Sequence, residues 1–181
     1  MNRWGRLFSS LLVAGGVLFA APGAAAPGDE PPPPTDAEIA KFVAVQNALV
    51  ADPGRADEIC ALGKGESGND GSGDRSLAAA GRKIEANAIT GPLVRRQGLT
   101  GQRYAQVTMH VAAGLLGLAI ADDADRDEPK PNGVGPNRAA LLRNSPAARV
   151  VAPRQAELTE LFGRLEAFCA SDDAESEEEY E

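Results

Sequence analysis

The chain contains very little histidine and cysteine, and this shortage limits the chemistry that it can support. Its 181 residues include one histidine, His110, and two cysteines. With no second histidine, a metal site would need carboxylates and the cysteines, and no ligand spacing in the sequence supports one. Neither cysteine lies in a CxxC or CxxCH motif, which disfavours a thioredoxin-type redox site and covalent haem attachment. We therefore expect no cofactor.

The short motifs of common enzyme classes are also missing. The chain contains neither GxSxG, which presents a serine nucleophile, nor GxxxxGK[ST], whose backbone cradles phosphates. We therefore expect no catalytic residues, and a protein that is not an enzyme.

An excess of basic charge is missing as well, since the formal net charge is -8 at pH 7. Binding to nucleic acid or to an anionic membrane surface needs a basic surface, so we expect neither. Much of the negative charge lies at the C-terminus, where seven of the eleven residues 171–181 are acidic. A run of like charge without apolar periodicity predicts a solvated, disordered tail.

Long apolar runs and strand patterns are absent from the rest of the chain. The run 111–121 has eleven residues, whereas a membrane span needs about 20. It therefore predicts a buried core helix, and no membrane span in the mature chain. No segment of useful length alternates apolar and polar residues with β-branched enrichment, which indicates an all-α fold.

The N-terminus does carry a recognisable signal. Arg3 and Arg6 precede a short apolar segment, residues 7–21, and small residues follow with Gly23 and Ala25 placed for cleavage after Ala25. The alternative is an N-terminal membrane anchor, but about 15 apolar residues are short for a bilayer. We therefore expect an exported protein, periplasmic or secreted.

The expected export bears on the state of the two cysteines, Cys60 and Cys169. In an oxidising compartment an isolated pair of cysteines is more often a disulfide than two free thiols. A bridge closing a loop of about 110 residues contributes roughly 4–5 kcal/mol in the chain-entropy model. It would help a modest core, because only 4% of the residues are aromatic.

Composition and helix signals divide the chain into four parts. A helical domain lies between a proline-rich spacer and the acidic tail, and it is interrupted by two irregular loops at about 63–75 and 122–136. The expected parts are a signal peptide over 1–25, the spacer over 26–34, the helical domain over 35–170 and the tail over 171–181.

Apolar residues recur at three- and four-residue steps in three long segments, which predicts amphipathic helices. The first begins at a capping box formed by Thr35 and Glu38, and the second begins after Thr100. The expected core positions are Ile39, Phe42, Val43, Gln46, Leu49 and Val50, then Tyr104, Val107, Thr108, Val111, Leu115 and Leu118, and finally Leu158, Leu161, Phe162, Leu165, Phe168 and Cys169.

Shorter helices are expected between these segments. Ser76 is a candidate cap for a helix to about Gln97, which Pro92 should kink or restart, and Gly98 is a candidate helix-terminating glycine. Asn137 is expected to cap a short helix through 143, and Pro153 to start the last one. These elements predict a small antiparallel helical bundle of three to four main helices with long flexible loops.

His110 and Tyr104 lie in the stretch "GLTGQRYAQVTMHV" and raise the question of an active site. His110 lies well away from the centre of the apolar stripe, so we interpret it as a solvated or rim histidine and not as a general base or metal ligand. Tyr104 is interpreted as a core residue whose hydroxyl reaches the edge of the bundle.

Asp123, Asp125 and Asp127 are the metal candidates that the sequence offers. They alternate after a helix as the first ligands of an EF-hand loop do, but Glu128 occupies the position of the required glycine and Val134 the twelfth position. We expect a solvated helix exit there and no metal.

Two segments together resemble a known family. "TDAEIAKFVAV" opens the mature region, and "GLTGQRYAQVTMHVAAG" has the form Gly-Leu-Ser/Thr-x-x-x-Tyr followed by a helix. This is similar to the bacterial family labelled domain of unknown function DUF4168, which consists of small exported helical proteins. The resemblance covers some 40 residues and implies no catalytic positions.

We therefore expect an exported, non-enzymatic helical protein, an interaction or envelope-support module with an unknown protein partner. The alternative is a periplasmic carrier of a small ligand or metal cation, with acidic loops and space beside Gly114 and Gly117 as its site.

Overall fold

The computed structural model describes residues 32–52, 60, 76–124 and 136–175. The expected signal peptide, most of the proline-rich spacer, the expected loop over 63–75 and the end of the acidic tail lie outside the described residues. Within those ranges every regular element is a helix, which confirms the all-α fold. The elements are α2 (Asp36–Val50), α4 (Leu77–Ala86), α5 (Thr90–Arg96), α6 (Gly101–Ala124), α7 (Pro136–Arg143), α8 (Pro146–Val151), the 3₁₀ turn η2 (Ala152–Arg154) and α9 (Gln155–Glu175).

The helices begin and end largely where local chemistry predicts. Thr35 and Glu38 form the expected capping box of α2, and the Ser76 side chain accepts a hydrogen bond from Ala79 N at the start of α4. Thr100 Oγ1 accepts from Arg103 N at 3.1 Å, and α6 begins one residue after it. Gly98 ends α5 with a φ of 69°, a conformation that glycine adopts without a Cβ penalty.

The break between α4 and α5 comes earlier than Pro92, where we expected it. Asn87 Oδ1 accepts hydrogen bonds from Ile89 N at 2.9 Å and Thr90 N at 2.8 Å. This side chain satisfies backbone donors that a helix end leaves free. Pro92 then lies in the first turn of α5, where its missing N–H costs nothing.

Three boundaries in the C-terminal third differ from the prediction. Asn137 is the second residue of α7 and not its cap. Pro153 lies in the turn η2, and α9 begins at Gln155. The helix α9 also continues to Glu175, five residues into the segment whose composition predicts a solvated tail.

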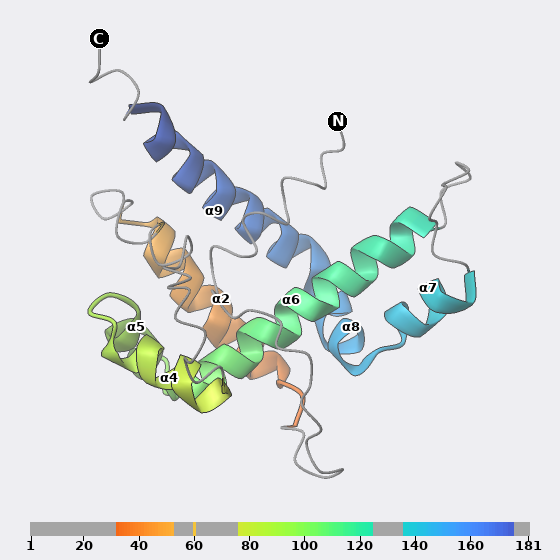
Figure 1. The fold of residues 1–181 in the computed structure, drawn as a ribbon, viewed down its shortest axis with the longest axis horizontal. Helices are drawn as coiled ribbons and strands as arrows, with labels where there is room; N and C mark the ends of the chain where they lie inside the picture. Colours follow the sequence, from red (N-terminus) through yellow and green to blue (C-terminus); the bar gives the residue numbers. More distant parts are fainter. Residues whose placement is uncertain (1–31, 53–59, 61–75, 125–135, 176–181) are drawn as a thin grey trace.

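The long helix α6 organises the rest of the fold (Figure 1). It contacts α4 and α5 near its N-terminal end, α7 and α8 near its C-terminal end, and α2 along its side. The α2 and α9 helices lie side by side and run in the same direction, because Arg154 contacts Asp36 at their starts and Arg164 contacts Asn47 further along. The whole segment from α4 to α8 separates them in the chain, so no short loop forces them to be antiparallel.

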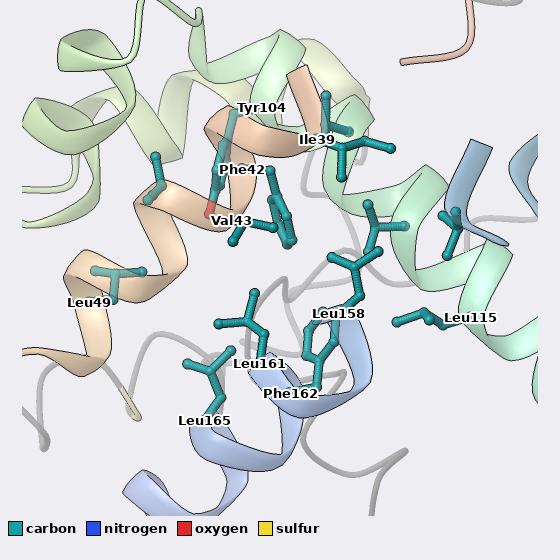
Figure 2. Packing of buried hydrophobic residues seen from close by; sticks show 14 of the residues in the cluster. Ile39, Phe42, Val43, Leu49, Tyr104, Leu115, Leu158, Leu161, Phe162 and Leu165 are labelled. Carbon is teal, nitrogen blue, oxygen red and sulfur yellow. The ribbon is translucent and has the colours of Figure 1, made fainter. Parts of the chain in front are cut away.

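The core lies where α2, α6 and α9 meet, and Figure 2 shows its side chains pointing toward one another. Phe42 of α2 is fully buried, and its ring centroid is 5.7 Å from that of Tyr104 and 6.4 Å from that of Phe162. Such tilted aromatic pairs add to the free energy of apolar burial. The predicted core positions are confirmed except that Val50, Phe168 and Cys169 are partly buried.

A close crossing of α4 and α6 depends on glycine. A Cβ atom at Gly81 would lie 2.5 Å from Gln102 N, and one at Gly101 would overlap the Gly81 carbonyl oxygen. The backbones therefore touch here, and Glu85 Oε1 accepts a hydrogen bond from Gly101 N at 2.7 Å. This crossing places α4 and α5 beside the N-terminal end of α6.

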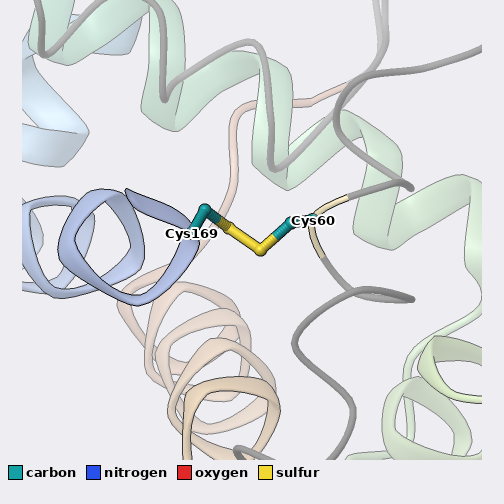
Figure 3. Close-up of a disulfide and its surroundings, with 2 residues drawn as sticks. All are labelled: Cys60 and Cys169. Atoms are coloured by element: carbon teal, nitrogen blue, oxygen red, sulfur yellow. A yellow bond between two sulfur atoms is a disulfide. The ribbon is translucent and has the colours of Figure 1, made fainter. Parts of the chain in front are cut away.

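The structure pairs Cys60 with Cys169, as predicted (Figure 3). Their Cα atoms are 5.7 Å apart and 109 positions apart in the sequence. Cys60 is buried, and the bridge joins the C-terminal part of α9 to the chain that follows α2. It therefore fixes one end of the α2–α9 pair.

Candidate functional site

A bidentate ion pair joins the starts of α2 and α6. Arg103 Nε lies 2.6 Å from Glu38 Oε1, and Arg103 Nη2 lies 2.8 Å from Glu38 Oε2. The same guanidinium donates to the carbonyl oxygens of Pro32 at 2.9 Å and Pro33 at 3.4 Å. Arg103 therefore holds the chain that precedes α2 against the first turn of α6.

This contact changes the acidity of Glu38. The hydrogen bond from Arg103, with further hydrogen bonds from Thr35, lowers the pKa of Glu38 from 4.5 to about 2. Glu38 thus stays ionised at any pH near neutrality. A carboxylate that is committed to a helix cap and a guanidinium acts as a structural group and not as a proton donor.

Tyr104 is a core residue, as predicted, but the expectation that its hydroxyl reaches the edge of the bundle is wrong. The residue is 3% exposed, and Tyr104 Oη accepts a hydrogen bond from Gln46 Nε2 at 2.7 Å. Burial raises the pKa of Tyr104. Gln46 Oε1 has no hydrogen-bond partner among the described residues, so this buried pair is only partly satisfied.

His110 is half-buried on the flank of α6. Its Nδ1 lies 2.9 Å from the carbonyl oxygen of Gln106, one turn earlier. Because a carbonyl oxygen only accepts, Nδ1 carries the proton of this contact. A histidine bonded to its own helix in this way fits the interpretation as a rim residue.

One of the three metal candidates lies among the described residues. Asp123 is an exposed residue near the end of α6, while Asp125 and Asp127 lie outside the described residues. Among the residues described here, no three His, Cys, Asp or Glu side chains come together in a group that could hold a metal ion.

The space beside Gly114 and Gly117 that we considered for a ligand is filled by the protein. A Cβ atom at Gly114 would lie 2.6 Å from Ala147 O and 2.7 Å from Val151 Cγ2, both of α8. One at Gly117 would lie 3.6 Å from Leu142 O of α7. These glycines allow close approach of α7 and α8, which fill the space that a carrier site would need there.

The candidate site is a shallow depression between the C-terminal end of α2 and the helix α5. It has a volume of about 220 Å³ and a mixed lining, in which apolar residues alternate with exposed polar atoms. Arg96 and Asp52 bring the charges to its lining. The other lining residues are Ala48, Leu49, Ala88, Ile89, Pro92 and Leu93.

The size of this depression suits the binding of a protein partner more than the binding or turnover of a small molecule. Small-molecule pockets usually measure roughly 300–1,000 Å³, and the volume of about 220 Å³ lies below that range. It has the dimensions of a recess for one side chain of a partner, with a positive and a negative group to orient it. An apolar anchor held in such a recess is the usual centre of a protein interface.

By length and composition alone, α6 could cross a membrane over Gly101–Asp123. Half of its most apolar window is buried inside the protein, and Val107 and Val111 of this helix are fully buried. A core helix of a soluble protein passes the same test, and the contacts of α6 fit that reading. The absence of a membrane span from the mature chain stays a prediction.

Sequence reasoning missed the depression and the Arg103–Glu38 pair. The pair joins residues 65 positions apart, and nothing in the local pattern of either residue indicates the other. The depression is formed by two helices, and the break that positions α5 was not expected at Asn87. Only a prediction of the α2–α5 contact could have revealed it.

Comparison with protein-family models, with curated proteins and with solved structures gives no match to this chain. The resemblance to the DUF4168 family therefore stays a prediction.

Proposed function

We propose that this protein is an exported, non-enzymatic helical protein that works by contacting a protein partner in the cell envelope or outside the cell. Its helical body supports one interaction surface, which is the depression between α2 and α5. The mature protein is periplasmic or secreted.

The Cys60–Cys169 disulfide supports export. Disulfides persist in oxidising compartments and are rare in the cytosol. A bridge that spans 109 positions contributes roughly 4–5 kcal/mol to the free energy of unfolding in the chain-entropy model. The fold is therefore most stable in an oxidising compartment, where the bridge persists. This agrees with the signal peptide that the sequence predicts.

The observation that carries the proposal is the form of the depression. Its volume of about 220 Å³ is small for a carried ligand. Its mixed lining, with Arg96 and Asp52 beside apolar residues, favours a single anchoring side chain that has both apolar and polar parts. The space that a carrier would need beside Gly114 is occupied by α8. The geometry therefore favours an interaction module over the alternative of a carrier.

A binding experiment with paired variants tests this function. Immobilised wild-type protein is incubated with envelope extract, and the retained proteins are compared with those retained by Leu93→Asp and Leu141→Asp. Leu93 lines the depression, while Leu141 on α7 is 73% exposed and lies away from it. We expect Leu93→Asp to reduce retention of the specific partner at least tenfold and Leu141→Asp to leave it unchanged.

A control for folding makes the result decisive. Circular dichroism must show that both variants keep the wild-type helix content, because a charge at the partly buried Leu93 can also destabilise the fold. Equal retention by Leu93→Asp and wild type would contradict the proposal, and so would turnover of a compound in a substrate screen.

A further inference from the structure

The depression lies at the end of the molecule from which the C-terminal segment of the chain leaves. Arg164 Nη2 of α9 donates to Asn47 Oδ1 of α2 at 2.7 Å, and Asn47 directly precedes the lining residue Ala48. Further along α9, the bridge from Cys169 to Cys60 holds the same end. In Figure 1 the C-terminal ends of α2 and α9 and the helices α4 and α5 lie on one side of the molecule.

The charges of the two regions are complementary. The segment 76–98 carries four basic residues and one acidic residue, Glu85, in a chain whose net charge is -8. The segment 171–181 carries seven acidic residues and no basic one. The basic residues of the first segment, all of them exposed, are Arg82, Lys83, Arg95 and Arg96.

The last six residues, 176–181, also have the right side chains for the depression. Their sequence "SEEEYE" places one aromatic residue, Tyr180, between glutamates. A tyrosine is a common anchor in apolar recesses because its ring is large and rigid. Arg96 at the lining can face the neighbouring carboxylates, and Arg95 adjoins it in the sequence.

A second basic region lies on α7 and α8, beside the C-terminal end of α6 and away from the depression. Arg138 of α7 and Arg149 of α8 are exposed, and Arg143 of α7 donates to Ala121 O near the end of α6. The α4–α5 side meets α6 at Gly101, twenty residues earlier, which is about 30 Å along the helix axis. In Figure 1 the C-terminal end of α9 lies on the side of α2 and α5 and away from α7 and α8, which favours the first basic region.

We propose that residues 176–181 of the chain bind the depression between α2 and α5 within the same molecule. Tyr180 fills the recess with its amphipathic ring, and the adjacent glutamates face Arg95 and Arg96. The C-terminal segment then competes with the external partner for this surface. This consequence rests on the proposed function, whereas the intramolecular contact itself does not.

Fluorine NMR on the full mature chain labelled with 3-fluorotyrosine tests the contact. The label gives one resonance for Tyr104, which reports on the core, and one for Tyr180, and a Tyr180→Phe variant assigns them. We expect the Tyr180 resonance to differ from that of the free peptide 176–181. A soluble gadolinium reagent should broaden it at least threefold less than the peptide signal.

Two matched charge reversals identify the surface. Arg96→Glu should move the Tyr180 resonance and its broadening to the values of the free peptide, while Arg149→Glu on α8 should leave both unchanged. The Tyr104 resonance must stay in place in both variants, which excludes unfolding as the cause. Should Arg96→Glu unfold the chain, Arg96→Gln provides the same comparison with a smaller change.

Several outcomes would overturn the proposal. They are a Tyr180 resonance at the peptide position in the wild type, protection that survives Arg96→Glu, an equal response to Arg149→Glu, and protection that disappears on dilution, which would show exchange between copies. No partner is present in this experiment, so its failure would leave the proposed function standing.

Discussion

Glu38 uses one carboxylate both to cap α2 and to bind Arg103, so its protonation affects two parts of the fold. Its folded-state pKa of about 2 lies below the ordinary 4.5. A depressed pKa means that the ionised form stabilises the folded state, so the contribution is complete above about pH 4.5 and is lost as the pH falls toward 2. The shift corresponds to at most about 3 kcal/mol.

Replacing Arg103 with Met should therefore lower the free energy of unfolding by about 1–3 kcal/mol at pH 7. The difference from wild type should shrink as the pH falls from about 4.5 toward 2, because Glu38 is then protonated in the unfolded chain and begins to lose its ion pair in the folded one. Urea denaturation at pH 7, 4 and 2.5 measures this, with Arg149→Met as the control for loss of an exposed arginine. A difference that is constant with pH would contradict the role given to Glu38.

The partly satisfied pair of Gln46 and Tyr104 gives a second prediction at this scale. Tyr104→Phe removes the hydroxyl and leaves the buried Gln46 amide without its partner, which should cost about 1–3 kcal/mol. Adding Gln46→Leu removes the polar group altogether, so the double variant should regain most of that stability. Chemical denaturation of the two single variants and the double variant gives the coupling energy. A double variant less stable than Tyr104→Phe would contradict the cost assigned to the unpartnered Gln46 amide.

Single residues were predictable where their contacts are local in the sequence. The capping box at Thr35 and the glycine at Gly98 follow from backbone chemistry within a few positions, and both are confirmed. Gln46 was predicted as a core position, but its partner Tyr104 is 58 positions away. No local pattern identifies such a partner.

At the scale of helices, two glycines inside long helices differ in the space available for a side chain. A Cβ atom at Gly114 of α6 would lie 2.6 Å from a carbonyl oxygen of α8, while one at Gly163 of α9 would meet nothing within 4 Å. Both lie inside long helices, where alanine is intrinsically favoured by about 1 kcal/mol. Steric contact therefore decides the outcome.

Gly114→Ala should destabilise the protein by about 1–3 kcal/mol, because α8 must move away from α6. Gly163→Ala should be neutral or stabilise it by up to about 1 kcal/mol. Parallel urea titrations compare the two variants. Equal effects would contradict the close contact of α6 with α8.

The long helices were predictable and the short ones were less so. An apolar stripe repeated over several turns identifies α2, α6 and α9, because burial of one face requires it. The six-residue helix α8 has no such stripe, and its signal is the pair Ser145-Pro146, a capping residue followed by proline. The break before α5 depends on the Asn87 side chain, whereas the sequence pattern predicted the break at Pro92.

At the scale of the whole molecule, the disulfide joins the C-terminal part of α9 to Cys60, 109 positions earlier in the chain. Reduction should lower the free energy of unfolding by about 4–5 kcal/mol in the chain-entropy model. Urea denaturation with and without a phosphine reductant measures the effect, and the Cys60→Ser/Cys169→Ser variant controls for side reactions. A difference below about 1 kcal/mol would show that the bridge does little for the fold.

The pairing of the cysteines was predictable from the number of cysteines and the export signal, whereas the arrangement of the helices was not. The parallel direction of α2 and α9 depends on the path of the intervening helices around α6. The depression results from that path, so it could not be seen in the sequence. The apolar stripes predict which residues are buried, but not which helices bury them.

Export to an oxidising compartment, with the chain closed by a disulfide, is the central claim of this account. The intact mass of the protein from the envelope fraction, taken after alkylation without reduction, tests it most directly. We expect the mass of residues 26–181 less two hydrogens, with alkylation of two thiols only after reduction. A chain that retains its N-terminal 25 residues and carries two alkylated cysteines before reduction would contradict it.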